Sequence, residues 1–275
     1  MKMQLSIQRL AQSLALIAFA ALPVCLFGQG PDAIESELAG ELKKLSNSAG
    51  SGTAADPGSV TASNGRVLEI LENAAGREDV LRHRFTRLDG LMWITTSPDG
   101  NLRIYSWDNQ QGGTMRYFNS VFQFRTESGK VGIKRKTTDA EGGATPFYHA
   151  IFETRASSGI VYLANYTAIA SSSLSIQGLR ALRIVDGQLD EIDLFGTREG
   201  TSTTLELQYD FASVADRPER PVSLFEIGRQ GSCMKHPSID ESEDSPTGGK
   251  VTDRFIVYVL EKGRYVEKPG ATCFQ

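Results

Sequence analysis

Segment 97–116 carries the residue types best suited to molecular recognition. The candidate binding residues are Arg103, Tyr105, Trp107 and Asp108. The first three alternate along a strand-like run, so they share one face on which a guanidinium can stack against aromatic rings. Asp108 then begins a turn toward two glycines. The pattern predicts a binding surface for a protein or a glycan; the alternative is a rigid hairpin that packs the same rings into a core.

The same segment is similar to a motif in poorly characterised exported bacterial proteins. That motif reads roughly S-x-D-G-x-x-R-I-Y-S-W-D-x-x-x-G-G-T-M, and this chain matches it from Ser97 to Met115. Later strands, including residues 255–266, match those proteins loosely. The resemblance implies export and a β-rich fold. It implies no activity, so it transfers no functional residues.

Motifs of catalysis are missing from the sequence. None of the three histidines, His83, His149 and His236, belongs to an H-E-x-x-H motif or a pair at helical spacing, so a zinc site lacks support. A G-x-S-x-G elbow, a P-loop and a G-x-G-x-x-G fingerprint are also absent. Cys233 and His236 could form a nucleophilic couple unless a disulfide engages Cys233. We therefore expect no enzyme, no metal and no cofactor.

Acidic residues leave one other chemistry open. Two carboxylates that meet in space could hydrolyse a glycan, but local spacing does not reveal such a pair. Two acidic segments, 186–193 and 240–244, have carboxylates of the kind that calcium accepts, and neither follows the EF-hand pattern. The first fits a hairpin turn better, and the second fits a solvated loop.

The N-terminal residues have the features of a secretory signal. Lys2 and Arg9 supply a positive region, and an apolar run at 14–22 follows that is too short to span a bilayer. We expect cleavage near residues 28–29. An uncleaved anchor and a lipidated Cys25 are the alternatives.

Cys233 and Cys273 remain after removal of the signal. An even pair of cysteines in an oxidising compartment predicts a disulfide. It would close a loop of about 40 residues and stabilise the fold by about 4 kcal/mol in the chain-entropy model. The alternative is two unpaired thiols.

The composition is that of a folded, mildly acidic protein, with 40% apolar and 23% charged residues. The formal net charge is −4, and loss of Lys2 and Arg9 would make it −6. Because nucleic acids are bound through basic patches, we expect no nucleic-acid partner. No apolar run after the signal is long enough to cross a membrane.

Two segments near the N-terminus have helical spacing. The apolar stripe of residues 32–46 consists of Ile34, Leu38, Leu42 and Leu45. A second helix is predicted from about residue 64 to residue 75. Residues 46–65 between them are rich in Ser, Gly and Ala, which predicts a flexible linker and a loosely tethered first helix.

From residue 91 onward the apolar period becomes two. Strict alternation at 205–211 predicts a strand with one wet face. Residues 160–163 and 255–260 are apolar on both sides and predict fully buried strands. Five turn sequences fit β-hairpins, near Gly100, Gly129, Gly159, Gly187 and Gly263.

These patterns predict a mainly β protein. We expect an antiparallel meander of hairpins, closed as a barrel, packed as a sandwich or splayed as a small propeller, with one or two short N-terminal helices. The predicted divisions are a signal peptide at 1–28, a helix plus flexible linker at 29–65, and a single β-rich domain with an N-terminal helix at 66–275.

The functional hypothesis that follows is an exported, non-catalytic binding protein of the cell envelope. It would be periplasmic or extracellular, with a protein or an envelope glycan as its partner. A specific version is an immunity or inhibitor protein against an envelope-acting hydrolase. The alternative is an envelope glycan hydrolase that uses paired carboxylates.

Overall fold

The computed structural model describes residues 28–50, 56–136, 143–156, 159–197, 200–241 and 248–272. Residues 1–27 of the signal peptide predicted at 1–28, and Cys273, lie outside these ranges. The structure is mainly β, as predicted, with its helices gathered at the N-terminal end. No described helix combines the length and apolar character needed to cross a membrane.

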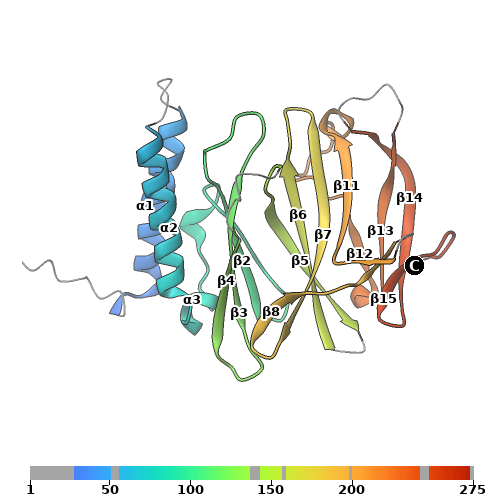
Figure 1. Ribbon diagram of the computed structural model, residues 1–275, viewed down its shortest axis with the longest axis horizontal. Helices are drawn as coiled ribbons and strands as arrows, with labels where there is room; N and C mark the ends of the chain where they lie inside the picture. Colours follow the sequence, from blue (N-terminus) through green and yellow to red (C-terminus); the bar gives the residue numbers. More distant parts are fainter. Residues whose placement is uncertain are drawn as a thin grey trace, which may run out of the picture.

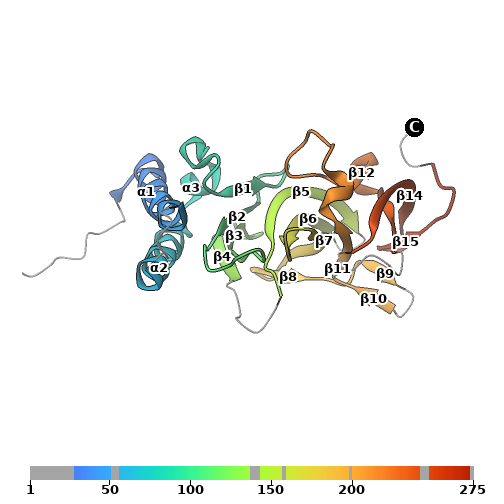
Figure 2. The same ribbon diagram turned by 90° about the horizontal axis from the view of Figure 1, so that it is seen from above.

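The chain forms four layers, with helices at one end followed by three sheets (Figure 1). The view from above has the same order (Figure 2). The helices are α1 (Pro31–Gly50), α2 (Pro57–Ala74) and α3 (Glu78–Arg82), with 3-10 turns at Thr86–Leu88, Phe211–Val214 and Arg229–Gly231. Of the three architectures that the sequence left open, these stacked sheets correspond to a sandwich.

Each sheet is largely antiparallel. The first sheet has the order β1 (Trp93–Thr96), β2 (Leu102–Asp108), β3 (Phe118–Arg125) and β4 (Val131–Lys136). The central sheet has the order β11 (Thr204–Asp210), β7 (Leu174–Val185), β6 (Gly159–Ile169) and β5 (Phe147–Ala156), and β8 (Gln188–Glu191) pairs with β7. The third sheet has the order β10 (Gly200–Ser202), β9 (Phe195–Thr197), β15 (Arg264–Glu267), β14 (Lys250–Glu261), β13 (Cys233–Asp240) and β12 (Glu226–Gly228).

The predicted hairpins are confirmed. The five turn segments join β1 to β2, β3 to β4, β5 to β6, β7 to β8 and β14 to β15, each an antiparallel pair. At the first of them, Gly100 has a φ of +72°, which a residue with a side chain rarely adopts. Each predicted turn therefore reverses the chain between neighbouring strands.

A separate apolar core fills each space between layers. The first lies between the helices and the first sheet, the second between the first and central sheets, and the third between the central and third sheets. Strand β6 contributes side chains to two of these cores, because Val161 and Leu163 enter the third core while Tyr162 enters the second. Its apolar residues on both faces are thus buried, as predicted.

The prediction of full burial for residues 255–260 is wrong. Strand β14 belongs to the outermost sheet, and only one of its faces meets a core. Tyr258 points into that core with 8% of its surface exposed, whereas Phe255 is 49% exposed. The apolar run therefore has one face toward solvent.

The predicted flexible linker is also largely wrong. Helix α1 continues to Gly50, and α2 begins at Pro57 after Asp56, whose carboxylate accepts the Ser59 N–H at 3.0 Å. The Ser-, Gly- and Ala-rich composition suggested a linker, but a capping residue and the burial of apolar side chains stabilise helices in this region. The stripe led by Ile34 and Leu38 is buried in the first core, so the first helix is docked rather than loosely tethered.

Candidate functional site

Three of the four predicted binding residues are buried rather than displayed. Arg103, Tyr105 and Trp107 have exposures of 8%, 1% and 1%. The Tyr105 hydroxyl donates to Gln123 at 2.8 Å, and the Trp107 indole N–H donates to Asn64 at 2.9 Å. These contacts satisfy the polar atoms of rings that pack against the helices. The predicted binding surface is wrong for these three residues, and the hairpin with a packed core describes them.

Arg103 has the same structural role. Its guanidinium donates to the carbonyl oxygens of Val80 and His83 at 3.1 and 2.7 Å, and to the Thr96 hydroxyl at 2.8 Å. It lies 5.7 Å from the ring centre of Phe85, which is its cation–π partner in place of the predicted Tyr105 or Trp107. Arg103 therefore joins the α3 region to the first sheet.

Asp108 differs, because it lies at the end of β2 where a large cavity opens. This main cavity has a volume of about 1330 Å³. The aromatic residues that line it are Trp93, Phe147, Tyr209 and Phe211. Its serine and threonine residues are Ser46, Thr114, Thr167, Ser171, Ser172 and Ser175, and its charged residues are Asp108, Arg116 and Arg220. Segments far apart in the sequence thus meet at one opening.

The loop after β2 forms one wall of the main cavity. Asp108 accepts the N–H of Gln110 at 2.8 Å, and Gln110 has a φ of +59°. A Cβ atom on Gly112 would lie 2.1 Å from the carbonyl oxygen of Met115, so the loop admits only glycine there. The Arg116 N–H donates to the Ile169 carbonyl at 2.9 Å and holds the loop to the central sheet. The wall is therefore preformed.

Aromatic rings form two flat surfaces in the main cavity. Trp93 is 39% exposed and stacks on Phe147, with ring centres 4.9 Å apart and planes 21° apart. Phe211 is 36% exposed, and the Arg220 guanidinium lies 5.5 Å from its ring centre. Sequence reasoning missed these rings because residues 93, 147 and 211 share no local pattern.

The floor of the cavity has an ordered polar row behind its hydroxyls. Gln177 donates to the Thr167 hydroxyl oxygen at 3.2 Å, and that hydroxyl lies 3.2 Å from Nε2 of His149. Burial lowers the pKa of His149 to about 4, so this ring is neutral at neutral pH. Neutral Nε2 can accept a hydrogen bond from the Thr167 hydroxyl, and the charge of His149 stays the same across the physiological pH range.

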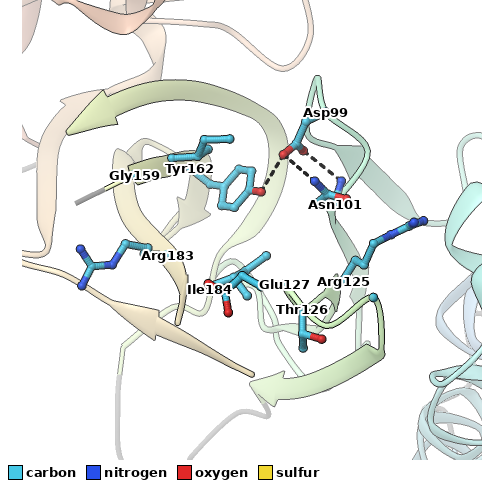
Figure 3. Close-up of a pocket in the computed structure, with 11 residues that line it drawn as sticks. Asp99, Asn101, Arg125, Thr126, Glu127, Gly159, Tyr162, Arg183 and Ile184 are labelled. Atoms are coloured by element: carbon cyan, nitrogen blue, oxygen red, sulfur yellow. Dashed lines mark hydrogen bonds between the residues drawn. The ribbon is translucent and has the colours of Figure 1, made fainter. Parts of the chain in front are cut away.

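A smaller cavity of about 420 Å³ lies at the opposite end of β2 (Figure 3). Asp99 is its central acid, and its carboxylate accepts hydrogen bonds from Ser97, Asn101 and Tyr162. Burial favours a higher pKa for Asp99, but these hydrogen bonds outweigh it and hold the pKa below its ordinary value. Both oxygens of Asp99 are thus engaged in stabilising its own turn.

Glu153 accompanies Asp99 at this turn. Its carboxylate accepts the backbone N–H of Asp99 at 2.7 Å. Burial, together with the nearby charge of Asp99, raises the pKa of Glu153. The two carboxylates have pKa values displaced in opposite directions, which is one feature of the acid pairs in glycan hydrolases.

Three potential metal ligands meet at the first turn of α1. Asp32, Glu35 and His83 offer ligand atoms within 4.8 Å of one another. Glu35 is 2% exposed, and its carboxylate contacts Nε2 of His83 at 3.0 Å and accepts the backbone N–H of Arg87. Both carboxylate oxygens of Glu35 thus have protein partners. The N-terminal end of α1 also stabilises the negative charge of this carboxylate. The cluster therefore serves to attach α1 to the segment that precedes the first sheet.

The predicted alternative of a Cys233–His236 couple is wrong. These residues are three positions apart on β13, so they point to opposite faces of the third sheet. His236 enters the third-core side between Phe225 and Tyr258, where burial lowers its pKa. Cys233 is buried on the outward side. Its predicted disulfide partner, Cys273, lies outside the described residues.

Comparison of the chain with protein-family models, with curated proteins and with solved structures found no match. Only the geometry of the described residues therefore bears on the function of this protein. The main cavity combines a volume of about 1330 Å³ with exposed aromatic rings and hydrogen-bonding groups, which is the usual composition of a ligand site.

Proposed function

We propose that this protein is an exported, non-catalytic binding protein of the cell envelope that holds a glycan in the main cavity. The observation that carries the proposal is the exposed Trp93 ring stacked on Phe147 at the wall of a 1330 Å³ cavity. A sugar ring has an apolar face that can lie on such a surface. Its hydroxyl groups can exchange hydrogen bonds with the hydroxyl-bearing floor.

Preorganisation of the site supports binding. Residues 108–116 are held by turn hydrogen bonds and by the Arg116 contact with Ile169, and Trp93 is supported from behind by Phe147. A ligand that enters such a site orders few side chains, so little of its interaction energy is lost as entropy. A concave site of this kind also fits a small ligand better than it fits a protein surface, so the immunity or inhibitor version stays a prediction.

The test is a binding measurement with soluble envelope glycan fragments. We expect Trp93→Ala to weaken binding by about tenfold or more, because it removes the exposed stacking surface. Phe255→Ala is the matched control, since Phe255 is an exposed aromatic residue on the outermost sheet. Failure of the unaltered protein to bind any fragment, or equal binding by both variants, would contradict the proposal.

A glycan hydrolase is the competing proposal, and Asp99 with Glu153 is the place where it would act. Their opposed pKa shifts favour it, whereas the engagement of both Asp99 oxygens by the turn opposes it. Release of new reducing ends by the purified protein, abolished in Glu153→Gln, would support hydrolysis. We expect no release.

The export part of the proposal rests on the N-terminal residues. We propose that residues 1–28 direct secretion and are removed, which places the mature protein in the periplasm or outside the cell. N-terminal sequencing of the mature protein tests this, with a start near residue 29 as the expected result. A cytosolic protein that retains Lys2 and Arg9 would contradict it.

The predicted Cys233–Cys273 disulfide fits that compartment. Lys268 donates its N–H to Val257 on β14 at 2.8 Å, and Val259 pairs with Cys233 on β13. Strand spacings place Lys268 about 12 Å from Cys233. The Ala271 N–H donates to the Lys268 carbonyl at 3.2 Å, which closes a turn up to about 7 Å across, and the two residues beyond it add about 7 Å. The chain is therefore long enough to bring Cys273 over Cys233. The burial of Cys233 on an outward face supports such a cover.

A further inference from the structure

We infer that the glycan held in the main cavity is acidic, and that Arg116 binds its carboxylate. This inference rests on the proposed function and names the class of ligand. The charged residues that line the cavity in the described part of the chain are Arg116, Arg220 and Asp108. Two cations against one anion give the cavity a positive sign within a chain of net charge −4. A local field opposite to that of the whole molecule favours an anionic ligand.

Arg220 is already engaged by its own loop. Its guanidinium donates to the carbonyl oxygens of Ala215 and Glu219 at 2.9 and 2.7 Å, and it covers the ring of Phe211. These contacts fix its position. Arg220 therefore shapes the cavity and contributes charge, while a ligand would have to break its hydrogen bonds to pair with it closely.

Arg116 is held much less tightly. Its side chain is 42% exposed, and its contact with the Asp108 carboxylate is long, at 3.4 Å. Asp108 cannot follow a movement of Arg116 because its other oxygen accepts the Gln110 N–H at 2.8 Å. A guanidinium has five donors in a planar fork that matches a carboxylate in two-point contact. A ligand carboxylate can thus replace the weak contact with Asp108 by a stronger one.

Arg116 lines the same cavity as the aromatic surface formed by Trp93 and Phe147. The backbone N–H of Arg116 is fixed to Ile169 at the end of β6, so the side chain starts from the same rim that Trp93 lines. A sugar that lies on Trp93 would then present a ring substituent to the guanidinium. The ligand that fits is a saccharide whose ring carries a carboxylate, either directly or on a short ether arm.

The experiment compares two tetrasaccharides that differ in their carboxylates. The acidic probe alternates N-acetylglucosamine with N-acetylmuramic acid and carries no peptide, and the neutral probe is N-acetylglucosamine tetrasaccharide. We expect the acidic probe to bind about tenfold more tightly. Arg116→Gln should remove that preference, whereas Arg116→Lys should restore part of it. The preference should also fall as salt is raised.

Arg135→Gln provides the matched control. Arg135 is an exposed arginine on β4, paired with Glu72 at 3.2 Å and outside the cavity lining. It should keep the full acidic preference. Equal affinity of the unaltered protein for both probes, or a preference that survives Arg116→Gln, would overturn this inference while the proposed function stands. Failure of both probes to bind would overturn the two together.

Discussion

At the scale of single residues, Asn64 shows how the helix layer holds the first sheet. Its side-chain oxygen accepts the Trp107 indole N–H at 2.9 Å, and its amide nitrogen donates to the Asn109 carbonyl at 2.8 Å. Trp107 and Asn109 flank Asp108 at the entrance to the loop that forms the cavity wall. One buried amide on α2 therefore helps to position the loop that forms the cavity wall, although Asn64 itself does not line the cavity.

Replacement of Asn64 by leucine should destabilise the protein. Asn64→Leu leaves the buried N–H of Trp107 without its acceptor, so we expect the free energy of unfolding to fall by about 1–3 kcal/mol. Asn73→Leu, at an exposed position of the same helix, is the control and should change stability little. Chemical denaturation followed by circular dichroism measures both. Equal effects would show that the Trp107 contact contributes nothing.

Glu35 is a second residue with an effect on the whole fold, because its charge makes the stability of the protein depend on pH. Burial favours a higher pKa, but the hydrogen bonds from His83 and Arg87 outweigh it and lower the pKa of Glu35 below its ordinary value. A lowered pKa in the folded state means that the stabilisation is present above the unfolded-state pKa and is lost as the pH falls through the folded-state pKa.

We therefore expect Glu35→Gln to be less stable than the unaltered protein at neutral pH and to lose less stability on acidification. Denaturation curves between about pH 6 and about pH 3 measure the difference. Glu37→Gln is a control on the same helix, since Glu37 pairs with Arg66 at a partly exposed site. Parallel acid profiles for unaltered protein and Glu35→Gln would refute the assignment.

At the scale of elements, the loop between β2 and β3 is a rigid part of the first sheet rather than a flexible connection. The motif residues of β2 from Leu102 to Trp107 are buried, and those within the loop form turn hydrogen bonds. The segment whose sequence suggested a resemblance to exported bacterial proteins thus packs into the first core and builds a cavity wall. The packing and the turn hydrogen bonds of these residues therefore explain the motif without a role in catalysis or binding.

Two neighbouring glycines allow a sharp test of this loop. Gly112→Ala would place a Cβ 2.1 Å from the Met115 carbonyl and force the loop to move, whereas a Cβ on Gly113 would meet no atom within 4 Å. We expect Gly112→Ala to lose stability by about 1–3 kcal/mol and to lose glycan binding, and Gly113→Ala to retain both. Identical behaviour of the two variants would contradict a preformed wall.

At the scale of the whole molecule, four layers are joined through strands that face two cores. Strand β15 pairs with the edge of β14 opposite to β13 and Cys233, and a bond from the residues that follow β15 to Cys233 would add a covalent connection across the third sheet. That connection is the proposed disulfide. It would join the final residues to the sheet farthest from the helices, at the end of the molecule where Phe255 and Val266 are exposed.

Cys273→Ser tests the connection. In mature protein isolated from the periplasm, we expect no reactive thiol after unfolding without reductant, and one thiol in the variant. Loss of a crosslink over about 40 residues should lower the free energy of unfolding by about 4 kcal/mol in the chain-entropy model. Two reactive thiols in the unaltered mature protein would disprove the disulfide.

Local patterns in the sequence predicted the elements better than the site. Alternation located the strands, and the turn residues located the hairpins, because both are decided by neighbours in the chain. Alternation could not show that both faces of β2 are buried, since that depends on layers formed elsewhere. The partner of Trp107 is Asn64, and the partner of Trp93 is Phe147, so neither contact leaves a local signal.

The central sheet has a consequence for any attempt to make a smaller version of this protein. Val161 and Leu163 rest against the third sheet, while Tyr162 rests against the first. Dividing the chain on either side of the central sheet would expose a full apolar face and produce a fragment that aggregates. A minimal scaffold must keep all four layers, and exposed hairpin tips such as residues 127–130 are the places to graft new sequence.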